Sequence, residues 1–99
     1  MSNGTVTWSP RGADARVVVV GGINADLKAR TTAPLVPGTS NPGTATLTPG
    51  GVGRNVAENL AHLGRPVALV GVVGDDDLGR LVLDATSAAG VDVTHVRCR

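Results

Sequence analysis

Continuous apolar runs and stretches of helical periodicity alternate along the chain. Residues 17–20 (Val-Val-Val-Val) and 67–73 (Val-Ala-Leu-Val-Gly-Val-Val) are apolar without alternation, which is typical of strands buried on both faces. Apolar residues recur with helical spacing over 53–64 and 76–89, and residues 91–96 alternate between apolar and polar. The pattern therefore predicts three strands of a mainly parallel sheet, with 17–20 in a central position, and two flanking helices.

A second pattern lies between the first strand and the first helix. Residues 27–33 and 44–48 alternate like strands with one wet face, and residues 34–43 between them hold three prolines and two glycines. We expect two short strands joined by an open loop over about residues 27–48. The predicted fold class is α/β, with a small separate β unit.

Three glycines in four positions precede the first predicted helix. Pro49 is expected to end the preceding strand, and Gly50, Gly51 and Gly53 leave the backbone open to close approach by a ligand. A helix that begins there offers unpaired N–H donors and the positive end of its dipole, which suit anions and hydroxyl lone pairs. Asn55 in the first turn adds a side chain that both donates and accepts hydrogen bonds.

The spacing of apolar residues in this helix predicts which of its faces is buried. Val56, Ala57, Leu60, Ala61 and Leu63 form one apolar face, so Arg54, Glu58, Asn59 and His62 are expected mostly on the solvated face.

Two polar residues follow the first buried strand. Asn24 and Asp26 lie just past its carboxyl end, where open α/β sheets bind ligands, and their spacing places both on one side of an extended chain. Asn and Asp also form local turns with their own backbone, and this simpler interpretation remains open.

The glycine-rich segment resembles a known family signature. The residues that carry the resemblance, at these spacings, are Gly50, Gly51, Gly53, Asn55, Ala57, Gly64 and Gly74. They resemble the first signature of the ribokinase-type (PfkB) carbohydrate and nucleoside kinases, over about residues 17–96. The form Gly-Gly-Val-Gly-Arg-Asn-Val-Ala-Glu-Asn is most similar to the pseudouridine kinase branch, since ribokinases proper tend to carry a lysine in place of Val52.

The resemblance implies a set of expectations. Residues 17–99 would be the amino-terminal part of a ribokinase-like kinase domain, with residues 27–48 as its lid, behind a flexible tail over residues 1–16. The reaction would transfer phosphate from ATP, with Mg²⁺, to a hydroxymethyl group of a sugar or nucleoside, and pseudouridine is favoured. The lid would also allow a homodimer. The residues implied to bind substrate are Asn24, Asp26, Gly50, Gly51, Gly53 and Asn55.

The chain lacks parts that such a reaction needs. In the family the proton acceptor is an Asp in a later Gly-Ala-Gly-Asp-type segment, and no Gly-x-Gly-Asp occurs here. We therefore assign no catalytic residue or ATP-binding residue to this chain and expect it to be inactive alone. The alternatives are a truncated, non-catalytic ribosyl-binding module, and an interaction fragment whose strands pair with a partner.

Other motifs support simpler interpretations. The glycines do not fit a dinucleotide fingerprint, because they follow Pro49 and Val56 stands where a third glycine belongs. Residues 75–77 (Asp-Asp-Asp) are expected to cap a helix rather than to bind a metal. Solitary His62 and His95 are assigned no catalytic role.

Composition narrows the partners and the compartment. The 99 residues carry a net charge of +1 without a basic cluster, so neither nucleic acid nor a membrane surface is indicated. One cysteine, Cys98, cannot form an internal disulfide, and neither a signal peptide nor a long apolar stretch is present. We expect a cytoplasmic protein, and we assign no role to Trp8 or Cys98.

Overall fold

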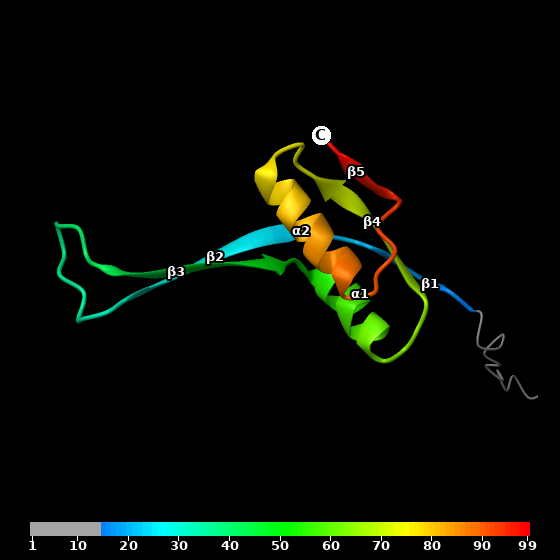
Figure 1. Ribbon diagram of the computed structural model, residues 1–99, viewed down its shortest axis with the longest axis horizontal. Coiled ribbons are helices and arrows are strands. Elements are labelled where there is room, and N and C mark those ends of the chain that lie inside the picture. Colours follow the sequence, from blue (N-terminus) through cyan, green and yellow to red (C-terminus); the bar gives the residue numbers. More distant parts are fainter. Residues whose placement is uncertain (1–14) are drawn as a thin grey trace, which may run out of the picture.

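The computed structural model describes residues 15–99, which form five strands and two helices (Figure 1). In chain order they are β1 (Val17–Val20), β2 (Asn24–Thr31), β3 (Gly43–Gly50), α1 (Val52–His62), β4 (Val67–Val73), α2 (Asp77–Ala88) and β5 (Val96–Cys98). Strands β1, β4 and β5 form a parallel sheet in the order β1-β4-β5, and β2 pairs with β3 in a separate antiparallel hairpin. The predicted α/β class is confirmed.

The centre of the parallel sheet is β4. It pairs with β1 from Val17 opposite Val67 and with β5 from Val96 opposite Gly71. Val67 and Leu69 are buried and pack with Ala57 of α1, so the core lies between this helix and one face of the sheet. The predicted strand over residues 67–73 is confirmed, and its first three residues and Val73 are buried as expected, but Val72 is 52% exposed.

The prediction that β1 is a central strand buried on both faces is wrong. Only Val19 packs against the core, whereas Val18 and Val20 are 58% and 76% exposed. The reason is that β1 is an edge strand among residues 15–99, and no described element covers the face that carries Val18 and Val20. A run of β-branched residues indicates a strand but does not say which neighbours will cover it.

The expected apolar face of α1 is also partly wrong. Ala57 is buried, but Val56 and Leu63 are 45% and 78% exposed, while Arg54 is only 3% exposed. The helix turns Gly53, Arg54 and Ala57 inward, because its start lies against the turn between β1 and β2. Close packing at that contact, rather than hydrophobicity alone, sets the rotation of the helix.

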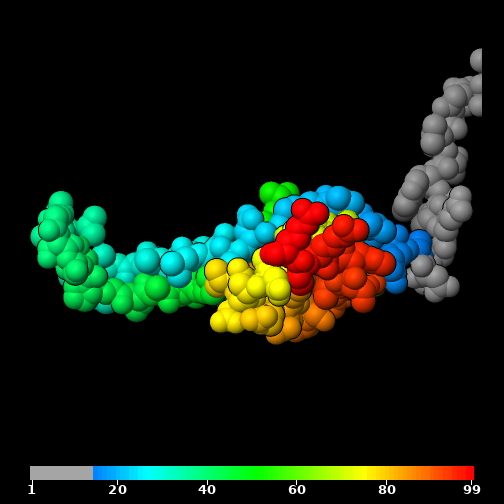
Figure 2. Space-filling model, turned by 90° about the horizontal axis from the view of Figure 1, so that it is seen from above, coloured from blue at the N-terminus to red at the C-terminus, as the bar shows by residue number. Residues whose placement is uncertain are grey.

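The hairpin projects from the body of the molecule as a long arm (Figures 1 and 2). Its strands extend further than the predicted range of 27–48, because pairing continues to Asn24 opposite Gly50. Pro49 lies inside β3 instead of ending it, which a two-stranded ribbon permits since each strand is an edge. The expected single wet face is not found, because nearly all of β2 is exposed to solvent.

The last strand begins later than predicted. Residues 91–95 contain only an isolated bridge between Asp92 and Ala68, and the strand proper is Val96–Cys98. The Asp92 carboxylate accepts from the hydroxyl and the amide of Thr94, at 2.5 and 3.0 Å, and this local turn interrupts pairing. The same two bonds, the hydroxyl's first, hold the pKa of Asp92 below its ordinary value.

The turn after β1 is in backbone contact with the start of α1. The Arg54 amide donates to the Gly22 carbonyl (3.1 Å), and a Cβ on Gly53 would lie 2.7 Å from the Cα of Gly21. Gly51, the residue before the helix, has a positive φ of 96°, which favours glycine. The glycines on both sides therefore allow the sheet, hairpin and helix to meet at one point.

The start of α2 follows the capping prediction. Asp76 is the N-cap, and its carboxylate accepts from the Gly79 amide at 2.8 Å. Asp77 pairs with Arg80 on the exposed surface (2.6 Å). The helix contacts both strands of the hairpin near its base.

The amino-terminal tail and the possibility of a membrane-spanning helix remain to be described. Residues 1–14, with Trp8 and most of the predicted tail, lie outside the described residues, and Arg16 forms an ion pair with Asp92 (3.3 Å). Within residues 15–99, neither helix is long and apolar enough to cross a membrane.

Because of the contact between the turn and α1, we expect replacing a helix glycine by alanine to destabilise the protein instead of stabilising it. Gly→Ala in a helix ordinarily stabilises by up to about 1 kcal/mol. Gly53→Ala should instead lower the free energy of unfolding by about 1–3 kcal/mol, because the new methyl group meets the backbone of Gly21 and Gly22. Urea unfolding followed by circular dichroism measures the change. The control is Gly22→Ala, which meets open space and should stay within about 0.5 kcal/mol of the parent.

The three successive aspartates should differ in their contribution to stability. Asp76→Ala removes the N-cap and should lower the free energy of unfolding by about 1 kcal/mol. Asp75→Ala, whose side chain makes no hydrogen bond to the described residues, is the matched control and should be close to neutral. Equal losses in the two variants would mean that the effect is general electrostatics at the helix start and not the cap.

Candidate functional site

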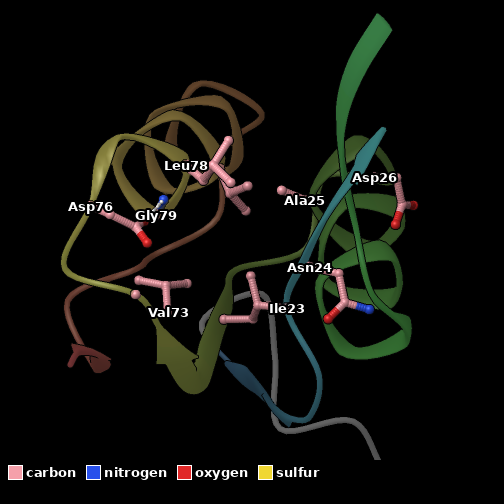
Figure 3. A pocket seen from close by; sticks show the side chains of 10 residues that line it. Ile23, Asn24, Ala25, Asp26, Val73, Asp76, Leu78 and Gly79 are labelled. Atoms are coloured by element: carbon pink, nitrogen blue, oxygen red, sulfur yellow. Dashed lines mark hydrogen bonds between the residues drawn. The ribbon is translucent and has the colours of Figure 1, made fainter. Parts of the chain in front are cut away.

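The two polar residues predicted from the sequence lie on one side of β2. Asn24 and Asp26 are two apart in the strand, and both are exposed. Figure 3 shows their side chains directed away from α2, whereas Ile23 and Ala25 point toward the space beside that helix. They belong to a paired strand, so the interpretation as local turn formers does not describe their backbone.

Asp26 lies against the end of the partner strand. Asn24 pairs with Gly50 and Asp26 with Thr48, and the Asp26 carboxylate covers Gly50 so closely that a Cβ there would overlap it. Only glycine at position 50 leaves room for the carboxylate in this place. The structure therefore brings Asp26 and the first glycine of the glycine-rich segment together.

The helix start next to this carboxylate has no side-chain cap. Gly51 occupies the N-cap position, contributes no side chain, and faces the Gly22 carbonyl. The described residues supply no acidic group in the first turn of α1. The arrangement thus places an acceptor, Asp26, close to a helix start where backbone donors are gathered.

The other two predicted residues have further roles in the structure. Gly53 is buried against Gly21, which gives a packing reason for a glycine there. Asn55 is exposed, and its Oδ1 accepts a hydrogen bond from Nη2 of Arg54 at 2.9 Å. In the part of the chain that the structure describes, no hydrogen bond joins the side chain of Asn55 to Asn24 or Asp26.

Sequence reasoning missed Arg54. Its guanidinium is buried and reaches Glu58 (2.5 Å) on its own helix and the hydroxyl of Thr86 (3.4 Å) on α2. The i,i+4 spacing of Arg54 and Glu58 is a signal that the sequence does contain. Thr86, 32 residues away, could not be paired with Arg54 from spacing alone.

A pocket of about 510 Å³ lies on the opposite side of β2, between that strand and the start of α2 (Figure 3). Asn24 and Asp26 border it through their place in the strand, and Asp76 in its wall already accepts the capping bond. Residues 15–99 contain no group of three or more His, Cys, Asp or Glu that could hold a metal ion. We assign no ligand to this pocket.

Comparison with known proteins identifies the family of the chain. The model of the pfkB family of carbohydrate kinases matches residues 14–98. An uncharacterised sugar kinase (YeiI) of Escherichia coli K12 is 48% identical over 77 residues, and the pseudouridine kinase of the same organism is 44% identical over 77 residues. A guanosine-inosine kinase of Exiguobacterium acetylicum is 41% identical over 81 residues. These matches cover 78–82% of the chain and 21–27% of the relatives.

Solved structures show the same arrangement of elements. A carbohydrate kinase from Agrobacterium tumefaciens superposes with a TM-score of 0.79 at 34% identity, over 85% of this chain and 27% of that one. The Arabidopsis thaliana ribokinase complexed with ribose and ATP gives 0.73 at 32% identity, over 87% and 28%. The predicted ribokinase-like fold is confirmed, and the chain spans about a quarter of the length of these proteins. The chain belongs to the pfkB family of carbohydrate kinases.

Proposed function

We propose that this chain is the substrate-binding and lid portion of an ATP-dependent kinase that phosphorylates a hydroxymethyl group of a sugar or nucleoside. The observation that carries the proposal is the Asp26 carboxylate, which covers Gly50 directly before the start of α1, where no side chain caps the helix. A carboxylate accepts hydrogen bonds from hydroxyl groups, and backbone amides at a helix start donate to hydroxyl oxygens. A ligand with neighbouring hydroxyls, such as a ribosyl group, suits both.

In this proposal each polar group has a distinct task. Asp26 accepts from a sugar hydroxyl and Asn24, on the same side of β2, binds a neighbouring one. Gly50, Gly51 and Gly53 permit close approach, and Asn55 binds the sugar from the helix side. These bonds orient the acceptor hydroxymethyl group for in-line attack, and such positioning is, with electrostatic stabilisation, what a protein mainly contributes to phosphoryl transfer.

Pseudouridine is the favoured substrate. The segment Gly-Gly-Val-Gly-Arg-Asn resembles the pseudouridine kinase branch, and a pseudouridine kinase is among the relatives at 44% identity. The guanosine-inosine kinase at 41% identity supports a nucleoside more generally.

ATP is the proposed phosphate donor. The superposed Arabidopsis ribokinase is described with ribose and ATP bound. Mg²⁺ is implied by the chemistry, and residues 15–99 contain no cluster of three or more His, Cys, Asp or Glu that could hold it. The chain contains no residue that we assign as proton acceptor, and we propose that it transfers no phosphate alone.

The hairpin is the proposed lid. It is largely exposed and projects beyond the body, so it can cover a ligand bound at its base. Its outer edges, which pair with no other strand of residues 15–99, also support a homodimer formed through the lid. The proposed compartment is the cytoplasm, where ATP is available and where the exposed thiol of Cys98 stays reduced.

The same exposed edges favour one alternative, an interaction fragment whose hairpin adds a strand from a partner protein. A non-catalytic ribosyl-binding module is the other alternative, and it shares the Asp26 site. Sugar binding that depends on Asp26 excludes the interaction fragment. Sugar binding without any ATP-dependent turnover in a protein that carries both halves of the kinase domain would favour the binding module.

Substitution of the polar residues should weaken ligand binding. Asp26→Ala removes a charged acceptor and should lower the affinity for ribose or pseudouridine by about 10- to 150-fold, whereas Asn55→Ala should lower it by about 2- to 10-fold. Titration calorimetry with ribose, pseudouridine and uridine measures both effects. Arg80→Ala, on the exposed surface of α2, is the control and should bind like the parent. Unchanged affinity in Asp26→Ala would refute the sugar site.

Gly50→Ala tests the same site without removing a polar group. The added methyl group overlaps the Asp26 carboxylate and must displace it, so ligand affinity should fall by at least about tenfold. The free energy of unfolding should change by less than about 1 kcal/mol, because a side-chain end and not backbone has to move. A parent-like affinity together with a displaced carboxylate in the variant's structure would contradict the role of Asp26.

A further inference from the structure

The buried guanidinium of Arg54 is the most unusual polar group among the described residues. Arg54 is 3% exposed, and its Nε has no hydrogen-bond partner in residues 15–99. Nη1 donates to Thr86 on α2, and Nη2 donates to both Glu58 and Asn55. Burying a charge that is incompletely hydrogen-bonded costs stability. The bond to Glu58 on the same helix is therefore not enough to explain why an arginine occupies this buried position.

The bond to Asn55 determines how the amide of that residue is oriented. A guanidinium has donors and no acceptor, so only the carbonyl oxygen of Asn55 can face it. The NH₂ group of Asn55 must then point away from Arg54. Because Asn55 is otherwise exposed, its side chain would rotate freely without this bond.

We propose that Arg54 is a positioning residue, which holds Asn55 so that its NH₂ group is presented as a donor to an oxygen of the ligand. This inference rests on the proposed function, in which Asn55 contacts the sugar. A donor there complements the acceptor on β2, since a hydroxyl can donate to Asp26 while its neighbour accepts from Asn55. The hydrogen bond from Arg54 to Asn55 thus acts as a clamp. This clamp orders the amide before the ligand arrives and so reduces the entropy lost on binding.

The contacts of Arg54 also connect this donor to the second helix. Thr86 is fully buried, and its hydroxyl donates to the Val82 carbonyl (2.7 Å) while accepting from Arg54. Glu58 holds the same Nη2 that binds Asn55, so the guanidinium is fixed from three sides. The alternative is that Arg54 only joins α1 to α2, in which case its loss would act on stability and not through Asn55.

The first test measures the mobility of the Asn55 side chain by ¹⁵N relaxation of its NH₂ group. We expect an order parameter of about 0.8 in the parent chain and one below about 0.6 in Arg54→Met, which removes every donor at similar length. Arg54→Lys, which keeps the charge but not the fork, should give an intermediate value. A flexible amide in the parent, or an equally rigid one in Arg54→Met and Arg54→Lys, would overturn the proposal without any ligand.

The second test is a double-mutant cycle with pseudouridine and ribose as probes. Arg54→Met should weaken binding by about 2- to 10-fold, as Asn55→Ala does, and the double variant should be no weaker than Asn55→Ala alone. Arg80→Met, which removes an exposed arginine paired with Asp77 on α2, is the matched control and should bind like the parent.

The outcomes of the cycle separate the two claims. If Asn55→Ala leaves affinity unchanged, the contact of Asn55 with the sugar fails, whereas the mobility measurement still decides the clamp. If Asn55→Ala weakens binding but Arg54→Met does not, the clamp is refuted and the sugar site stands. If Arg54→Met weakens binding by the same factor with or without Asn55, Arg54 acts only as a support between helices.

Discussion

The close approach of two glycine-containing backbones holds the described part of the molecule together. The turn after β1 lies against the first residues of α1, where Gly21 faces Gly53 and the Gly22 carbonyl accepts from the Arg54 amide. A side chain on Gly21 or Gly53 would force the two segments apart, so the contact depends on glycine at these two positions. The rotation of α1, the burial of Arg54 and the place of the β2 base all follow from this contact.

The elements themselves were largely predictable from the sequence. The bounds of β4 agree with the apolar run at 67–73, and both helices begin and end within two residues of their periodic stretches. Local rules suffice there, because periodicity and a terminal glycine act over a few residues. The exposure of Val18 and Val20 could not be predicted in this way, since it depends on which segments cover the sheet. The late start of β5 depends on a side-chain bond between Asp92 and Thr94 that competes with strand pairing.

The place of a residue in the candidate site was predictable where it follows from the order of strands and helices. It was not predictable where it depends on how side chains pack. Asn24 and Asp26 were expected beside the glycine-rich segment because they follow the carboxyl end of a sheet strand, and Asp26 does lie against Gly50. The burial of Arg54 was missed, because a charged residue in a helix with an apolar face is ordinarily placed in solvent. Its partner Thr86 is close only after both helices have packed.

The edge position of β1 affects how the chain behaves in concentrated solution. The strand has an unpaired outer edge among residues 15–99, and two valines on one face are open to water. It is β-branched throughout and carries neither a charge nor a proline within its four residues, which are the features that natural edge strands use to prevent self-association. An edge of this kind favours pairing with another strand, so we expect residues 15–99 to associate along β1 more readily as their concentration rises.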